Sequence, residues 1–133
     1  MGVLPEREGR WSASFSSSTA APNEARCWLQ EILEGVEDGV DRSAASLLLT
    51  ELVTNAVRYG RSPALRVDIE LLDAKLVVGV TDNEPAVPTP GAPGPEDVGG
   101  RGMLLVERLS ANWGVSPRAS GKRVWFNLNR TMS

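Results

Sequence analysis

The sequence predicts an α/β (α+β) two-layer sandwich, in which helices cover one face of a mixed, mostly antiparallel β-sheet. Three observations support this class. Residues 65–71 alternate strictly between apolar and charged side chains, and residues 75–81 form an almost wholly apolar run after the two-residue turn Asp73-Ala74, which is typical of a β-hairpin. Residues 42–59 have a helical period. The order strand–helix–helix–strand–strand–loop–helix–strand–strand favours helices packed on one side of a sheet.

The N-terminal part of the chain predicts one strand and one helix. A chain of 133 residues is the size of a single domain, so we expect a flexible tail at 1–10 and one domain over 11–130. The alternation of Trp11 to Phe15 is typical of a short strand. A helix is expected from Ala21 to about Leu33, with Pro22 in its first turn.

The second predicted helix, Arg42–Tyr59, follows a plausible N-cap at Asp41 and precedes a glycine. Its apolar residues cover roughly half of the helical wheel, so it needs a broad partner surface such as a sheet. These core candidates are Ala45, Leu48, Leu49, Leu52, Val53, Ala56 and Val57. The opposite side is polar and carries Glu51, Thr54, Asn55 and Arg58.

The C-terminal part begins with an unusual segment. Pro85 to Gly102 contains five prolines and five glycines in 18 residues, and a loop this long inside a domain is usually functional or disordered. A helix is expected over Gly102–Leu109. Two final strands, Trp113–Ser116 and Lys122–Asn129, should be joined at Ser120-Gly121.

The composition excludes several classes of function. The chain has no histidine and one cysteine, Cys27, so histidine-dependent catalysis, phosphohistidine, internal disulfides and thiolate metal clusters are excluded. The formal charge of −3 argues against direct binding to nucleic acid. No apolar run is long enough to cross a bilayer, and we therefore expect a cytoplasmic protein that does not bind membranes.

Glu51 with Asn55, and Asp82, are two candidate sites. Glu51 and Asn55 are four residues apart, so they are neighbours on one helical face. An amide oxygen can ligate Mg²⁺, and a carboxylate can orient or deprotonate a nucleophile; the alternative is an ordinary solvated face. Asp82, at the end of the apolar strand, could accept a hydrogen bond from an amino group such as that of adenine, or it could simply form a turn.

A third candidate is the segment Gly99-Gly100-Arg101-Gly102, which directly precedes an apolar helix. Glycines at the start of a helix present backbone N–H groups and the positive end of the helix dipole to an anion. Arg101 could add a bidentate contact to a phosphate. The segment matches neither a Walker loop nor a complete Rossmann fingerprint, and it could also be a hinge that leads into a helix.

Taken together, these segments resemble a known superfamily. Leu49-Thr50-Glu51-Leu52-Val53-Thr54-Asn55-Ala56-Val57 resembles the N box of the GHKL ATPases and kinases. Val78 to Asp82 with Pro85 resembles its first glycine box, and Gly99 to Val106 resembles its second. The order and spacing are similar to those of the bacterial anti-sigma-factor serine/threonine kinases, and Gly121 to Trp125 resembles the closing strand of that branch.

This resemblance implies a Bergerat fold that binds ATP with Mg²⁺. By position, Asn55 would hold Mg²⁺, Glu51 would be the catalytic base, and Asp82 would receive the adenine amino group. Gly100 and Gly102 would let the backbone wrap the phosphates. The other expected ATP-binding residues are Arg58, Tyr59, Arg101 and Met103. The implied partners are a sigma factor and a small antagonist protein that is phosphorylated on serine or threonine, and a homodimer is plausible.

The sequence departs from the family pattern at three places. Asp82-Asn83-Glu84 lacks the glycine of the usual Asp-x-Gly, Tyr59 replaces a common histidine, and Arg123 stands where a small threonine often supports the adenine contact. The first departure favours an alternative function, a non-catalytic module that sequesters a sigma factor or another partner with or without bound nucleotide. The absence of histidine excludes a complete autophosphorylating histidine kinase.

Overall fold

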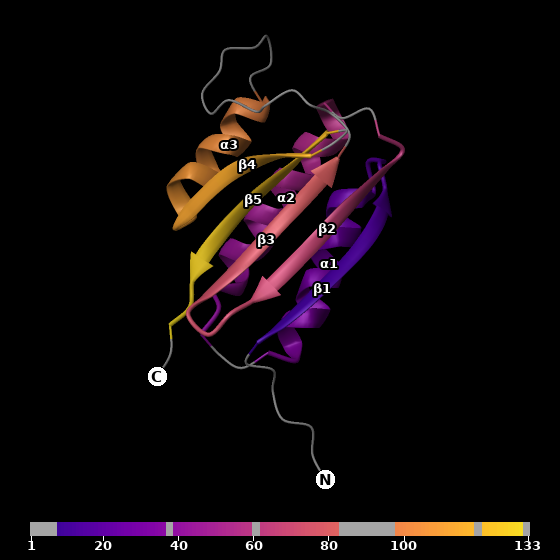
Figure 1. Ribbon diagram of the computed structural model, residues 1–133. Helices are drawn as coiled ribbons and strands as arrows, with labels where there is room; N and C mark the ends of the chain where they lie inside the picture. Colours follow the sequence, from indigo (N-terminus) through magenta and orange to yellow (C-terminus); the bar gives the residue numbers. More distant parts are fainter. Residues whose placement is uncertain (1–7, 37–38, 60–61, 83–97, 119–120, 132–133) are drawn as a thin grey trace.

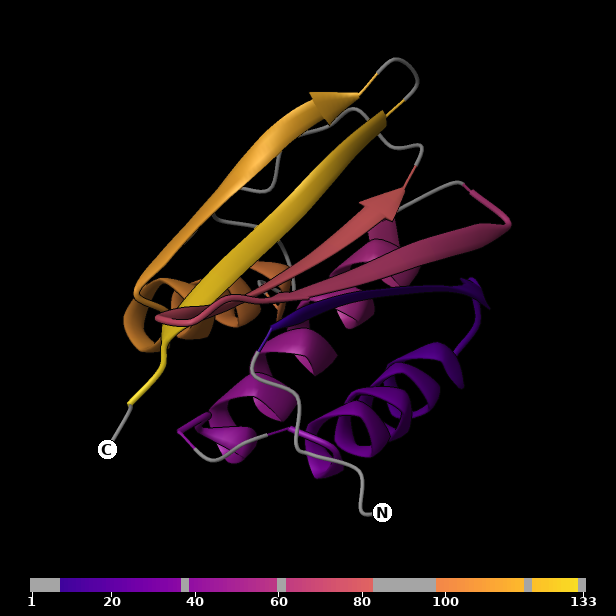
Figure 2. The ribbon, with the colours of Figure 1, turned by 60° about the horizontal axis from the view of Figure 1, so that its bottom comes forward.

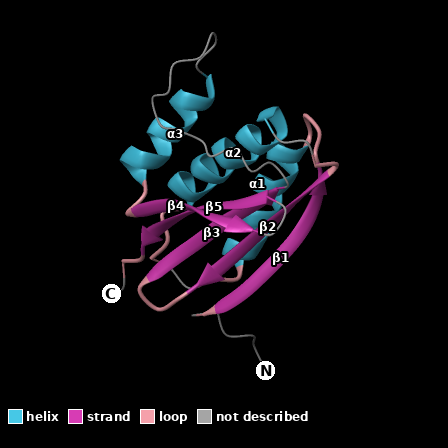
Figure 3. Cartoon of the chain, turned by 45° about the horizontal axis from the view of Figure 1, so that its top comes forward, coloured by secondary structure: helices cyan, strands magenta, loops and turns pink. Residues whose placement is uncertain are grey.

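A five-stranded sheet forms one layer of the protein and three helices form the other (Figures 1 and 2). The computed structural model describes residues 8–36, 39–59, 62–82, 98–118 and 121–131. The strand order is β1-β2-β3-β5-β4. Figure 3 shows the three helices together on one side of the sheet. The predicted two-layer α+β class is therefore confirmed.

The five strands follow the alternation that the sequence displays. They are β1 (Gly9–Ser16), β2 (Ala64–Leu71), β3 (Lys75–Asp82), β4 (Asn112–Arg118) and β5 (Gly121–Asn129). The backbone N–H of Leu72 donates to the carbonyl of Lys75 at 2.8 Å, which closes the predicted Asp73-Ala74 turn between β2 and β3. Strand β1 begins two residues before the expected position, at Gly9.

Each neighbouring pair of described strands is antiparallel, so the sheet is more uniform than the mixed sheet that we expected. The reason is the position of β5. The chain crosses from β3 through α3 to β4, which by itself would favour a parallel neighbour. The β4–β5 hairpin instead returns β5 into the space between β3 and β4.

The helices are α1 (Ala21–Glu34), α2 (Arg42–Tyr59) and α3 (Val98–Leu109). The bounds of α2 agree with the prediction, and the predicted core arc is buried except Val57, which is partly buried. The Asp41 carboxylate accepts a hydrogen bond from the Ala44 N–H at 3.0 Å, as an N-cap should. Phe126 of β5 is the largest fully buried side chain and lies in the core between the two layers.

Helix α3 begins at Val98, four residues earlier than predicted. The glycines of Gly99-Gly100-Arg101-Gly102 argued for a loop, because glycine disfavours helix. They instead lie within the first turns of α3. No helix in the described part of the chain is long and apolar enough to span a membrane.

Candidate functional site

The elements that carry the predicted site residues meet at one end of the domain. The carboxyl ends of α2 and β3 and the amino ends of α3 and β5 lie at this end (Figures 1 and 3). Only residues 60–63 separate α2 from β2, and the first residues of β2 pair with the last residues of β3, as in Arg66 with Thr81. The topology thus brings the N box and the end of the first glycine box to the same region.

Glu51 and Asn55 lie on the side of α2 that faces away from the core. Both are partly exposed, whereas Leu48, Leu52 and Ala56 on the other side are buried. Their four-residue spacing places them one helical turn apart. A carboxylate and an amide oxygen are therefore presented side by side from a rigid helix.

Arg58 and Tyr59 form the last turn of α2, and both are exposed. The guanidinium carbon of Arg58 lies 6.0 Å from the centroid of the Tyr59 ring, which is within the range of a cation–π contact. These two residues are close to the predicted site along the chain. Their expected contact with nucleotide stays a prediction.

Asp82 is buried at the carboxyl end of β3. In β3, it follows Leu76, Val78 and Val80 on the sheet face that the helices cover. Its Oδ1 atom lies 3.3 Å from Nζ of Lys122, and the side chains of Lys122 and Asp82 are 9% and 3% exposed. The expected acceptor of the adenine amino group is thus one partner in a buried ion pair.

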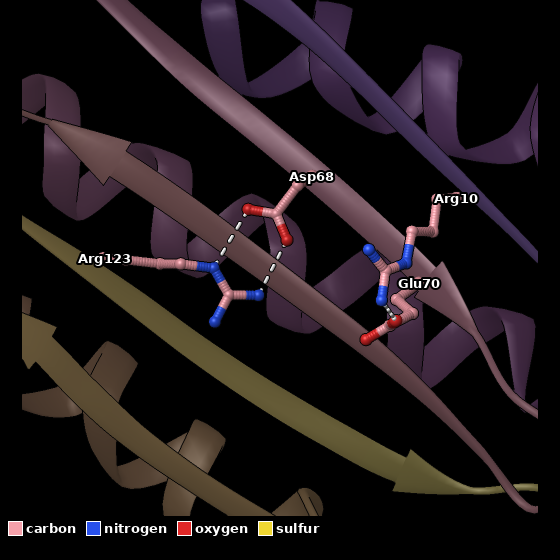
Figure 4. Close-up of polar contacts among 4 residues, drawn as sticks. All are labelled: Arg10, Asp68, Glu70 and Arg123. Carbon is pink, nitrogen blue, oxygen red and sulfur yellow. Dashed lines mark hydrogen bonds and ion pairs between the residues drawn. The ribbon is translucent and has the colours of Figure 1, made fainter.

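Lys122 was not predicted as a site residue, and the structure corrects our placement of Arg123. The residue directly opposite Asp82 in the sheet is Lys122. Arg123 points to the other face, where its Nε and Nη2 donate to the two Asp68 oxygens at 3.0 and 2.7 Å (Figure 4). The sequence could have predicted this, because alternate residues of a strand share a face and Lys122 alternates with the apolar residues Val124, Phe126 and Leu128. Trp125 made the pattern harder to read, because it is an apolar residue on the same face as Arg123.

The glycine-rich segment is described only by its backbone. The first four N–H groups of a helix have no partner within the helix, and in α3 these belong to Val98 through Arg101. This is consistent with the predicted anion cradle. Met103 is buried in the core. The side chains of residues 98–102 and all of residues 83–97, which include the predicted Pro85 loop, lie outside the described residues.

The donor set at this end fits Mg²⁺ and a nucleotide in two respects. The Asn55 amide oxygen is a hard ligand, and Mg²⁺ usually takes only one or two protein ligands beside substrate phosphates and water. The described residues contain no group of three or more His, Cys, Asp or Glu side chains that could hold a metal ion. The Asp82 carboxylate is a buried hydrogen-bond acceptor. Lys122 already contacts this carboxylate, so a nucleotide that binds Asp82 must share it with the Lys122 ammonium.

Comparison with known proteins agrees with this fold. A family model described as a histidine kinase-like ATPase domain matches residues 15–128. The signal transduction histidine-protein kinase AfsQ2 of Streptomyces coelicolor is 35% identical over 69 residues, which are 49% of this chain and 13% of that kinase. An uncharacterized protein of the same organism is 34% identical over 80 residues, which are 57% of this chain and 76% of that protein.

Two solved structures share the architecture. The RsbU and RsbW domains of Rv1364c from Mycobacterium tuberculosis match with a TM-score of 0.68 at 18% identity, over 92% of this chain and 32% of that chain. The Acinetobacter baumannii histidine kinase AdeS matches with a TM-score of 0.53 at 15% identity, over 92% of this chain and 68% of that chain.

The fold and the sequence boxes together define an ATP-binding domain of the GHKL superfamily. The family model covers most of the 133 residues. The chain belongs to the histidine kinase-like ATPase domain family.

Proposed function

We propose that this protein is an ATP-dependent serine/threonine protein kinase that phosphorylates a small antagonist protein and thereby regulates a sigma factor. The observation that carries the proposal is the placement of Glu51 and Asn55 one helical turn apart on one partly exposed face of α2. The resemblance of the three sequence boxes to anti-sigma-factor kinases supports the choice of substrate class. A cytoplasmic location and a homodimer are part of the same proposal.

Phosphoryl transfer depends on positioning and on stabilisation of charge. In this proposal Asn55 would hold Mg²⁺, which would supply positive charge to offset that of the ATP phosphates. Glu51 accepts the proton from the serine or threonine hydroxyl as its oxygen bonds to the γ-phosphorus. The bond from the γ-phosphorus to the bridging oxygen breaks, and ADP leaves. The backbone N–H groups at the start of α3 bind the phosphate oxygens.

A second function is favoured by two specific observations. The glycine of the first box is replaced in Asp82-Asn83-Glu84, and the Asp82 carboxylate is already paired with Lys122. Both features weaken the case for tight ATP binding. The corresponding alternative is a non-catalytic module that sequesters a sigma factor or another partner.

The kinase proposal is tested by separating binding from chemistry. Mg-ATP binding is measured by calorimetry, and transfer is measured with γ-labelled ATP and the partner proteins captured from the source cell. Glu51→Gln should leave Mg-ATP affinity nearly unchanged and slow transfer by about 10²–10⁴-fold, because general-base catalysis typically contributes that much. Asn55→Ala should weaken Mg-ATP binding itself, since a metal ligand is lost.

Glu107→Gln is the matched control, because Glu107 is an exposed carboxylate of α3 outside the proposed site, and it should affect neither measurement. If Glu51→Gln transfers phosphate as fast as the wild type, Glu51 is not the base. A wild type that binds its partner but transfers no phosphate contradicts the kinase proposal and favours the sequestering module.

A further inference from the structure

The Asp82–Lys122 pair is fixed by the backbone of the sheet. Asp82 and Lys122 are directly opposite each other in the antiparallel pairing of β3 with β5, and both belong to the set of side chains that the helix layer covers. The Nζ–Oδ1 distance is 3.3 Å, and less than a tenth of either side chain is exposed. A group that approaches Asp82 therefore meets the Lys122 ammonium beside it.

The Asp82–Lys122 pair interrupts an apolar pattern on the helix-facing side of β3 and β5. The other helix-facing positions of the two strands are apolar, namely Leu76, Val78 and Val80 in β3 and Val124, Phe126 and Leu128 in β5. Removing two charges from water is costly, and well-packed apolar residues often stabilise a protein as much as a buried ion pair does. Asp82 is also the residue that we expect to accept a hydrogen bond from the adenine amino group. A role of the pair in nucleotide binding would explain why two charges are kept at this position.

We propose that Lys122 is an affinity-determining residue of the nucleotide site, whose ammonium takes the hydrogen-bonding position at Asp82 that the amino group of adenine would use. The inference rests on the proposed role of Asp82 in nucleotide binding. A hydrogen bond from an ammonium to a carboxylate is roughly twice as strong as a neutral one. ATP must exchange this bond for one from a neutral amino group, and Lys122 thereby keeps the ATP affinity low.

The proposal reverses the sign that simple electrostatics predicts. ATP is a polyanion, so removing a nearby cation should weaken its binding through the lost attraction. If Lys122 competes with the base for Asp82, removing its ammonium should strengthen binding instead. The two explanations can therefore be separated by the direction of one measurement.

The experiment compares Mg-ATP affinity, measured by calorimetry, among four variants of the full chain. Lys122→Thr should bind Mg-ATP roughly tenfold to hundredfold more tightly than the wild type, which corresponds to one hydrogen bond to a charged group. Lys122→Gln, which keeps a donor without the charge, should be intermediate, and Lys122→Arg should stay weak. Lys75→Thr is the charge control: Lys75 is an exposed residue at the opposite end of β3, and this variant should bind no more tightly than the wild type.

Thermal unfolding provides a readout that is independent of activity. Without nucleotide, Lys122→Thr should lower the Tm by roughly 5 °C or more, because the buried Asp82 carboxylate loses a charged partner. Saturating Mg-ATP should then raise its Tm by more than it raises the Tm of the wild type. If Lys122→Thr is unfolded at the temperature of the calorimetry, the Mg-ATP affinity of Lys122→Gln tests the proposal instead.

If the wild type binds Mg-ATP and neither Lys122→Thr nor Lys122→Gln binds more tightly, the proposal for Lys122 is overturned while the proposed function stands. If neither the wild type nor any variant binds Mg-ATP, both are overturned.

Discussion

The ion pair between Arg123 and Asp68 offers a quantitative test of how this sheet is stabilised. The two residues lie on β5 and β2, which flank β3, so the Arg123 side chain must cross a central strand on the face without helices (Figure 4). The crossing passes over Gly79. A Cβ atom at Gly79 would lie 2.4 Å from the Arg123 Nε. The absence of a side chain at this glycine is therefore what makes room for the pair.

The expected coupling energy follows from the geometry of the pair. Two hydrogen bonds of 3.0 and 2.7 Å join the guanidinium to both carboxylate oxygens, and the side chains of Arg123 and Asp68 are 18% and 31% exposed. Exposed ion pairs contribute about 0.2–1 kcal/mol, and bidentate, partly buried ones contribute more. We therefore expect a coupling energy of about 1–1.5 kcal/mol.

The same sheet face holds a natural comparison. Arg10 and Glu70 form an ion pair with an N–O distance of 2.6 Å, but the Arg10 side chain is 84% exposed (Figure 4). The entropy of ordering a long exposed side chain and the screening by solvent offset most of the Coulomb attraction. We expect a coupling energy of at most about 0.5 kcal/mol for this pair.

The assay is a double-mutant cycle in urea. The wild type, Arg123→Met, Asp68→Asn and the double variant are unfolded at one pH, and the coupling energy is the deviation from additivity. Coincident transitions by fluorescence and circular dichroism check two-state behaviour. A parallel cycle measures the Arg10–Glu70 pair.

Gly79→Ala provides the decisive control. A methyl group there should displace the guanidinium, so the Arg123–Asp68 coupling should fall to near zero in the Gly79→Ala background. The raw stability of Gly79→Ala is less informative, because alanine in a strand regains roughly 0.5–1 kcal/mol of backbone entropy relative to glycine. Equal coupling energies for the two ion pairs, or a coupling that survives Gly79→Ala, would refute this reasoning.

Two further predictions concern local structure. Asp41→Ala should reduce the free energy of unfolding by about 1 kcal/mol in urea, since it removes the N-cap hydrogen bond to the Ala44 N–H; an unchanged value would mean that water replaces the cap without loss. Gly114→Ala should destabilise by about 1–3 kcal/mol, because a Cβ at Gly114 would lie 2.7 Å from the Trp125 ring. Thermal unfolding in a Trp125→Leu background should show a much smaller loss if the indole is the obstacle.

The sequence was most informative where structure is set by short-range periodicity. The bounds of α2, its buried arc and the Asp41 cap were all predicted from residues 41–59. The helical period alone also places Glu51 and Asn55 on one face, because residues four apart on a helix are neighbours whatever the rest of the fold does. The turn at Asp73-Ala74 is local in the same sense.

Long-range arrangement was decided by the tertiary structure. The sequence could not place β5 between β3 and β4, because strand order depends on which strand edges hydrogen-bond to each other and not on the order of the strands in the chain. It also could not show that Arg123 reaches Asp68 across Gly79, a contact between residues 55 positions apart. The early start of α3 at Val98 likewise goes against the local preference of its glycines.

The candidate site also combines features that local sequence determines with features that only the tertiary structure determines. The sequence by itself determined that Asp82 ends an apolar strand and that Glu51 and Asn55 share a helical face, since both statements need only local geometry. Only the tertiary structure decided that Lys122 is the partner of Asp82. The pairing of β3 with β5 brings these two residues together across 40 positions of sequence, and the parity of β5 decides that Lys122, and not Arg123, faces the helix layer.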